Sequence, residues 1–289
     1  MAAKSTRAEY PFPGPRNIYK PSKTIDNSRR GRHLDLQRLI ELRYIAGLGK
    51  NESRNVHMLF KAFKVLTFDV VGTLIDFERG MLDYLQRAAP DANIPDEDFL
   101  AAYRKARSSD GSGWYPDDLE RVWHLIAPTF GLPDDSATAR GFCDSVVDWP
   151  AYPDSAAALE RLGQRFKLVT MTNAQSWALG HFAATLGRPF DMELSCDDAL
   201  CEKPDPRYFA YARGRIEGAW GYRQADNLHV AQSQYHDIGV SMRQGIKTCW
   251  IERRFDQSGS GGTLESEHTP ADYHFHSLAE LADAVDAEG

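Results

Sequence analysis

Four short, nearly continuous apolar runs recur along the chain, and they restrict the possible folds more than any other feature of the sequence. They cover residues 64–69 (KVLTFD), 167–172 (KLVTMT), 227–231 (NLHVA) and 247–251 (KTCWI). Runs without polar alternation are typical of strands that are buried on both faces, as in a parallel sheet. Helical patterns lie between the later runs, at Pro153–Arg165 and Pro206–Glu217. We therefore predict an α/β fold with a doubly wound parallel sheet, whose ligands bind at the carboxyl ends of the strands.

Residues 78–150 interrupt this alternation with helical patterns alone. The candidate helices are Glu78–Ala89, Asp96–Ser109, Asp117–Phe130 and Asp135–Val147. A helical block that follows the first strand directly is most simply a cap over the site, and the alternative is a second domain with its own role. We predict a Rossmann-like core domain from residues 64–77 and 151–289, with a helical cap domain at 78–150.

Residues 1–63 differ in charge from the rest of the chain. They contain 13 Lys and Arg against 5 Asp and Glu, although the whole chain carries a net charge of −7. A basic arm could bind nucleic acid or anionic lipid, but this segment lacks interleaved aromatic residues. Met58 stands just before the first strand, as a start codon would. We predict a basic N-terminal extension that is disordered or not native, and we assign it no chemistry.

Composition points to a cytoplasmic protein. No apolar run approaches the ~20 residues that span a membrane, and the N-terminus lacks the apolar core of a secretory signal. The four cysteines form no C-x-x-C pair and are expected to be free thiols of a reducing compartment. We expect no nucleic-acid or membrane partner, and a homodimer is plausible.

The strongest chemical signal is the segment FDVVGTLID at residues 68–76. Asp69 ends a predicted buried strand, and the turn with Gly72 and Thr73 follows at once. A carboxylate at this edge of the sheet, with backbone N–H groups of a turn nearby, suits a covalent nucleophile with anion-stabilising donors. Taken alone, an Asp before a turn is usually a cap.

Other polar residues follow the ends of later strands in the same way. Each has an ordinary structural explanation, as a helix cap, a solvated charge or a first-turn acid. Together they predict one cluster at the carboxyl edge of the sheet. The candidate catalytic residues of this cluster are Asp69, Lys203 and Asp237, and its candidate substrate-binding residues are Thr73, Thr172, Asn173, Gln232, Ser233 and Gln234.

This ordered set, D-x-x-G-T, then T-N, then K-P, then a final Asp, resembles the haloacid dehalogenase-like (HAD) superfamily over residues 64–285. The resemblance implies that Asp69 is the nucleophile and that Thr73 and Thr172 bind and orient oxygens. It implies that Lys203 keeps Asp69 ionised, as a nearby cation lowers the pKa of a carboxyl group. Asp237 would position water or, in the phosphatase branch, bind magnesium.

This chain departs from the superfamily pattern at two positions that help to distinguish phosphatases from dehalogenases. Family phosphatases usually carry a second Asp two positions after the nucleophile as general acid, where this chain has Val71. They also usually carry an acid at the position of Gln232, which completes the magnesium site. Valine transfers no proton, and a neutral amide weakens a hard-cation site. A halide leaving group needs neither an acid nor a metal, so both losses favour carbon–halogen cleavage.

The chain resembles the 2-haloacid dehalogenases in particular. The sequence AYR ends in Arg104 on the second predicted cap helix, and the resemblance implies that Arg104 and Asn173 receive the halide. The match is incomplete, because that group commonly has Tyr, Asn and Tyr where this chain has Val71, Gln234 and Phe209. These differences leave the substrate identity and the water-activation step open.

We therefore predict a hydrolase that converts a small 2-haloacid to a 2-hydroxy acid through an aspartyl ester, without a cofactor. One alternative is a Mg²⁺-dependent phosphatase of the same superfamily, and another is a catalytically silent binding protein. We assign no metal ligands. His274 and His276 would share a face of a strand, but two histidines without a third ligand are more often structural.

Overall fold

A five-stranded parallel sheet forms the centre of the protein, in the order β2-β1-β3-β4-β5. The computed structural model describes residues 60–288, which belong to one compact unit of the chain. The strands are β1 (Val65–Phe68), β2 (Lys167–Thr170), β3 (Asn227–Ala231), β4 (Lys247–Ile251) and β5 (Tyr273–Phe275). The predicted α/β fold with a parallel sheet is thus confirmed. The four apolar runs correspond to β1–β4, and β5 is an additional strand that the pattern did not predict.

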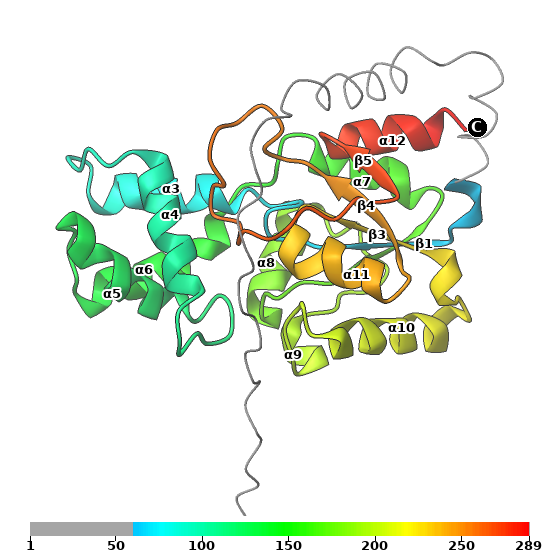
Figure 1. Cartoon of the computed structure of the whole chain (residues 1–289), viewed down its shortest axis with the longest axis horizontal. Coiled ribbons are helices and arrows are strands. Elements are labelled where there is room, and N and C mark those ends of the chain that lie inside the picture. The colour runs from blue at the N-terminus through cyan, green and yellow to red at the C-terminus, as the bar shows by residue number, and fades with distance from the viewer. Residues whose placement is uncertain (1–59, 289) are drawn as a thin grey trace, which may run out of the picture. The chain divides into compact units, whose positions relative to one another are not determined.

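Helices cover both faces of the sheet, which is why its strands are apolar throughout (Figure 1). Successive side chains of a strand point to opposite faces. Leu66 and Phe68 of β1 accordingly pack in one cluster with Leu159 and Leu281, while Val65 packs in a second cluster. The first cluster contains residues of α7 (Ser155–Gly163) and α12 (Leu278–Asp286), and the second contains residues of α10 (Pro206–Trp220) and α11 (Gly239–Arg243).

Shorter elements complete this part of the fold. They are η1 (Phe60–Ala62), α8 (Ser176–Thr185), α9 (Cys196–Ala199), η3 (Gln224–Asp226) and the π-helical turn η4 (Gln234–Ile238). The helical patterns in the sequence predicted α7 and α10, whereas α8, α9, α11 and α12 were not predicted. Helix α8 is apolar on most sides, so its sequence lacks the polar face that marks an amphipathic helix.

The helical block after β1 contains four helices, followed by the short turn η2 (Ser145–Asp148). They are α3 (Phe77–Ala88), α4 (Asp96–Arg107), α5 (Leu119–Phe130) and α6 (Ser136–Asp144). Its entry and exit run side by side, because the Asp76 N–H donates to Pro150 O at 2.8 Å and the Tyr152 N–H donates to Leu74 O at 2.9 Å. Trp123 and Phe142 pack in its core with ring centroids 5.1 Å apart. The proposed domain boundaries at residues 78 and 150 stay a prediction.

Gly80 allows α3 to pack closely against Trp149. A Cβ atom at Gly80 would lie 2.2 Å from the ring of Trp149, which is only 1% exposed and has no room to move. We therefore expect Gly80→Ala to lower the free energy of unfolding by about 1–3 kcal/mol through overpacking. Gly218→Ala in α10 is the matched control, since nothing lies within 4 Å of its Cβ position and alanine favours helix by about 1 kcal/mol. Urea unfolding should give opposite signs for the two variants, and equal effects would contradict this packing.

The remaining sequence predictions fall partly outside the described residues. All but the last four residues of the predicted basic extension, residues 1–63, lie there, as does Met58.

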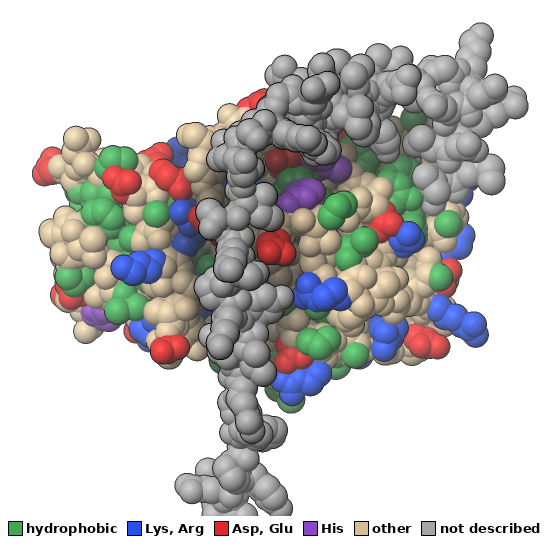
Figure 2. Space-filling model, in the orientation of Figure 1, with side chains coloured by type: hydrophobic (Ala, Val, Ile, Leu, Met, Phe, Trp, Pro, Cys, Tyr) green, Lys and Arg blue, Asp and Glu red, His purple; other side chains and the backbone are tan. Residues whose placement is uncertain are grey.

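Among residues 60–288, no helix is long and apolar enough to cross a membrane. The four cysteines are buried and form no disulfide. Basic and acidic side chains are interspersed over the visible described surface (Figure 2).

Candidate functional site

Asp69 after β1 and Asp237 in η4 after β3 meet Lys203 in the protein interior. Lys203 lies on the loop between α9 and α10. Lys203 Nζ donates to Asp69 Oδ1 at 2.9 Å and to Asp237 Oδ1 at 2.6 Å. The exposed fractions of the three residues are 6%, 2% and 0% in the order Asp69, Lys203, Asp237. One ammonium is therefore shared by two carboxylates, and little solvent screens the interaction.

Burial and charge act in opposite directions on these groups. Burial raises the pKa of Asp69 above its ordinary value, and the negative charge of Asp237 adds to this, while the Lys203 ammonium and the Thr73 hydroxyl oppose it. Burial also acts to raise the pKa of Asp237, but Lys203 and the His229 ring outweigh it and hold that pKa at about 2. The two carboxylates outweigh the burial of Lys203 and raise its pKa. The site therefore holds a charged lysine at neutral pH, and Asp237 loses its proton before Asp69.

The turn after β1 fixes the second oxygen of Asp69. Gly72 has a φ of +90°, which favours glycine, and the turn brings the Thr73 hydroxyl to 2.7 Å from Asp69 Oδ2 as a donor. The Gln232 N–H donates to Thr73 Oγ1 at 2.9 Å. Arg253 Nε donates to the Thr73 carbonyl at 2.9 Å and so holds the turn from outside. The carboxylate has little rotational freedom as a result.

A buried polar relay supports Asp237 from the opposite side. His229 Nε2 lies 2.9 Å from Asp237 Oδ1, and His229 Nδ1 lies 2.9 Å from Thr67 Oγ1, which accepts a hydrogen bond from Asn227. Because Thr67 accepts from Asn227, its own proton can go to Nδ1, and this leaves Nε2 protonated toward the carboxylate. Sequence reasoning missed this relay. The only signal was a histidine within an otherwise apolar strand.

A cavity of about 110 Å³ opens between the sheet edge and the helical block. Asp69 and Lys203 line it, together with Thr172, Asn173, Gln232 and Ser233 from the predicted set. Among residues 60–288, Asp69 is the only carboxylate that lines the cavity. The other wall contains aromatic and apolar residues, including Phe77, Tyr103 and Tyr115.

Several predicted residues orient the protein itself. Asn173 bonds the backbone of Lys203 at both ends of its amide, with Nδ2 donating to the Lys203 carbonyl at 2.8 Å and Oδ1 accepting from the Lys203 N–H at 2.7 Å. Thr172 Oγ1 accepts from the Ala174 N–H at 3.1 Å. Ser233 Oγ accepts from the N–H of His236, at the start of the π-helical turn. These bonds fix the loops that carry Lys203 and Asp237.

Three predicted substrate-binding residues, Thr73, Arg104 and Gln234, are absent from the cavity wall, and Thr73 acts through its bond to Asp69. Arg104 forms ion pairs with Glu97 at 3.0 Å and with Glu265 at 3.7 Å. Gln234 Oε1 accepts from the Thr269 N–H at 2.8 Å, because the π-helical turn directs its amide toward that loop. Arg107, one helical turn after Tyr103 on the same side of α4, lines the cavity instead.

Two basic residues of the cavity wall, His236 and Arg107, were not predicted as substrate-binding. His236 lines the cavity, and burial lowers its pKa to about 4, so its ring is neutral at pH 7. Arg107 is 15% exposed at its side chain, bonds Asp118 and lies over the Tyr115 ring at 5.3 Å. Residues 262–264, in the loop between β4 and β5, also line the cavity. Their sequence carries no chemical motif that could have indicated this position.

Comparison with known proteins agrees with this geometry. The family model for haloacid dehalogenase-like hydrolases matches residues 63–220, which is more than half of the chain. The chain belongs to the haloacid dehalogenase-like hydrolases. The predicted family is thereby confirmed, and so is the prediction that the protein is a hydrolase of this family.

Individual relatives of this haloacid dehalogenase-like hydrolase are distant. The (S)-2-haloacid dehalogenase 4A of Burkholderia cepacia is 25% identical over 242 residues, which cover 76% of this chain and 94% of that protein. The L-2-haloacid dehalogenase of Xanthobacter autotrophicus shares the fold with a TM-score of 0.64 at 21% identity, over 78% of this chain and 98% of that one. A putative HAD-hydrolase of Bacillus subtilis bound to magnesium does so with a TM-score of 0.62 at 20% identity, over 78% and 99%.

The two departures from the phosphatase pattern both lie on the cavity wall of this haloacid dehalogenase-like hydrolase. Val71 and Gln232 line the cavity, and the Gln232 amide bonds the Thr263 hydroxyl, with Nε2 at 3.1 Å from Thr263 Oγ1. Magnesium prefers carboxylate and other hard oxygen ligands in octahedral geometry. A wall with one carboxylate, already bonded to an ammonium and a hydroxyl, is a poor donor set for that ion.

Proposed function

We propose that this hydrolase converts a small 2-haloacid to the corresponding 2-hydroxy acid through an ester at Asp69. The observation that carries the proposal is the buried Asp69 carboxylate on the cavity wall, held by Lys203 at 2.9 Å and Thr73 at 2.7 Å. No acid lies where a phosphate ester would need one, since Val71 stands there. The similarity to an (S)-2-haloacid dehalogenase supports the same reaction.

In the first step, an Asp69 oxygen attacks carbon 2 of the substrate from the side opposite the halogen. The new C–O bond forms as the C–X bond breaks, and the halide leaves with the bonding electrons. Lys203 favours the ionised form of Asp69 against the effect of burial, and the wall of Phe77, Tyr103 and Tyr115 limits access of water. A halide needs no proton to leave, which is consistent with the absence of a carboxylic acid beside Asp69 on the cavity wall among residues 60–288.

In the second step, water attacks the carbonyl carbon of the Asp69 ester. The acyl–oxygen bond breaks, the 2-hydroxy acid leaves, and one oxygen of the regenerated carboxylate comes from water. We assign Asp237 the orientation of this water, because its Oδ2 is buried without a hydrogen-bond partner among the described residues. Lys203 would offset the negative charge that develops at the ester oxygen. No step requires a cofactor.

The size of the cavity supports a small substrate. A volume of about 110 Å³ holds only a few non-hydrogen atoms, far below the ~300–1,000 Å³ of pockets for drug-sized ligands. Its mixture of aromatic wall and localised charge suits a short acid with one carboxylate and one halogen. Arg107 is the guanidinium on this wall, and we propose that it binds the substrate carboxylate or the departing halide.

A parallel screen of haloacids and phosphate esters, with and without Mg²⁺, tests the proposal. We expect chloride release from 2-chloropropionate that is unchanged by EDTA, and little hydrolysis of p-nitrophenyl phosphate. A protein with the same fold has been solved with magnesium bound, so the screen has to test metal-dependent phosphate release as well. Metal-dependent phosphate release without chloride release would replace the proposal with the phosphatase alternative.

Substitutions of two arginines on α4 test which of them binds the anion. We propose Arg107 because it lines the cavity, whereas the resemblance implies Arg104. We expect Arg107→Lys to lower kcat/KM for 2-chloropropionate at least about tenfold, mainly by raising KM, because lysine loses the planar fork of donors. Arg104→Lys should change kcat/KM less than about threefold, because Arg104 bonds Glu97 and Glu265 outside the cavity. Steady-state kinetics with a thermal melt of each variant would check this, and the reverse order of effects would restore Arg104 as the anion-binding residue.

A further inference from the structure

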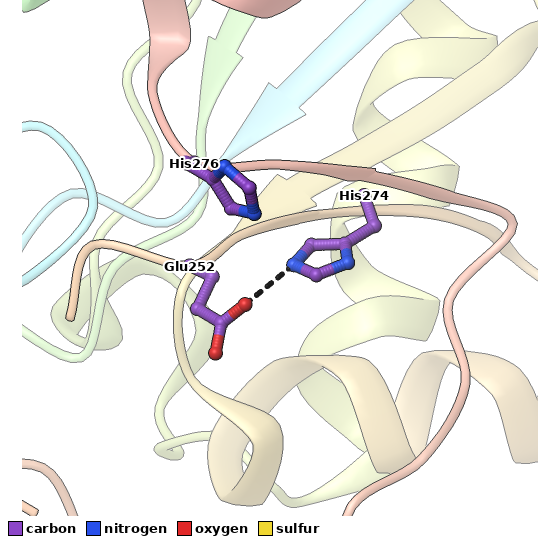
Figure 3. Close-up of side chains that lie close together, drawn as sticks. All are labelled: Glu252, His274 and His276. Atoms are coloured by element: carbon purple, nitrogen blue, oxygen red, sulfur yellow. Dashed lines mark hydrogen bonds and ion pairs between the residues drawn. The ribbon is translucent and has the colours of Figure 1, made fainter. Parts of the chain in front are cut away.

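His274 in β5 and His276 just after it lie near a third potential metal ligand that the sequence did not reveal. Glu252 follows β4, the strand paired with β5, and its Oε2 lies 2.7 Å from His274 Nε2. His276 comes two residues after His274, so both rings lie on the same side of the chain. One ligand atom from each of Glu252, His274 and His276 lies within 4.8 Å of the other two. Figure 3 shows the carboxylate and the two rings facing a common space.

Aromatic contacts hold both rings in position. The His274 ring stacks on Trp250 with centroids 4.4 Å apart, and the His276 ring stacks on Phe255 at 3.5 Å. The rings therefore need little reorientation to bind an ion, which reduces the entropic cost of binding. Side-chain exposures of 43% for His274 and 27% for Glu252 give an ion access from solvent. Histidine side chains also reach the visible surface in Figure 2.

We propose that Glu252, His274 and His276 bind a divalent transition-metal ion. Two imidazoles and one carboxylate form a donor set that suits zinc, copper or nickel, and three protein ligands leave a further position for water. The Glu252 carboxylate would offset one of the two positive charges of the ion. The ion would replace the hydrogen bond between Glu252 and His274 as the link between these strands.

This site is separate from the cavity that contains Asp69, but it lies at the base of a loop that reaches that cavity. Glu252 precedes the loop and His274 follows it, while Gly262, Thr263 and Leu264 in between line the cavity. A bound ion would link the two ends of the loop. It would stabilise the folded chain, because it binds three ligands that only the fold brings together.

Titration of the full-length, metal-free chain with Zn²⁺ tests the proposal by calorimetry. We expect one saturable equivalent in the wild type that His274→Ala/His276→Ala removes or weakens at least about tenfold, with Glu252→Gln intermediate. His268→Ala is the matched control, because this exposed histidine also contacts the Trp250 ring, at 5.1 Å, but lies outside the three ligands. Zn²⁺ should raise the Tm of the wild type and of the control more than that of the double variant.

Cobalt provides a readout of the ligands themselves. A visible Co²⁺ absorption band should appear with the wild type and be lost in the double variant, while the metal-free variants keep the wild-type circular dichroism. Zn²⁺ binding of equal affinity and stoichiometry in the double variant would overturn the proposal, since the ion would then bind elsewhere. Absence of saturable binding by the wild type at about 1 mM Zn²⁺ would overturn it as well. Neither measurement depends on the proposed dehalogenase reaction.

Discussion

Asp69→Asn is expected to abolish chloride release from 2-chloropropionate, with kcat lowered by about 10⁴-fold or more. An amide keeps the shape of the side chain and can still meet the Thr73 hydroxyl, but it lacks the nucleophilic carboxylate oxygen. Chloride release under saturating substrate measures the effect. Single turnover of the wild type in ¹⁸O-labelled water should first place the label in Asp69 and only later in the product.

The matched control for this variant is Asp76→Asn. Asp76 stands seven residues later and caps α3 by accepting from the Arg79 N–H at 3.1 Å, and it does not line the cavity. Asparagine caps helices about as well as aspartate, so activity and Tm should both stay near wild type. Chloride release that survives Asp69→Asn, or label that enters the product on the first turnover, would remove Asp69 from the nucleophile position.

Lys203→Met is expected to have the largest effect on stability. It leaves Asp69 and Asp237 buried without their shared cation, and breaking a buried pair in this way costs about 3–5 kcal/mol. Lys247→Met is the control, because its pair with Asp272 lies at the surface and should contribute about 1 kcal/mol or less. Chemical unfolding at pH 7 measures both, and a loss below about 1 kcal/mol for Lys203→Met would contradict the buried triad.

The effect of Lys203→Met should depend on pH. Asp237 has a folded pKa of about 2, below its ordinary value of 3.8, so its ionised form stabilises the wild type above pH 3.8. That contribution is lost as the pH falls toward 2. The stability difference between wild type and Lys203→Met should therefore be largest near neutral pH and shrink below about pH 4. A difference that stays constant from pH 7 to pH 3 would show that the lysine acts through packing alone.

Local sequence signals predicted the sheet and the polar cluster at its edge because both follow from short-range rules. Apolar runs predicted β1–β4. Residues that follow parallel strands lie at the same edge of the sheet, regardless of the length or course of the loops. Asp69 and Asp237 needed only this rule to be placed near each other. Lys203 lies on a loop, and its position was predicted from the ordered motif rather than from periodicity.

Other features of the site depend on contacts between distant segments, which the sequence does not encode locally. Arg104 and Arg107 lie in similar sequence surroundings near the end of α4. Only the packing of that helix decides which of them lines the cavity. The relay from Thr67 through His229 to Asp237 requires the register in which Thr67 pairs with His229 across β1 and β3. Register is set by the whole sheet.

The sequence by itself determined the α/β class, the positions of β1–β4 along the chain and the chemical identity of the groups at the sheet edge. Only the tertiary structure decided which side chains share a cavity, which ones hold each other in place, and that Glu252 joins His274 and His276. The physical reason is the sequence separation over which each kind of interaction acts. Periodicity and turn chemistry act over a few residues, whereas the Asp69–Lys203 bond and the Glu252–His274 bond join residues 134 and 22 positions apart.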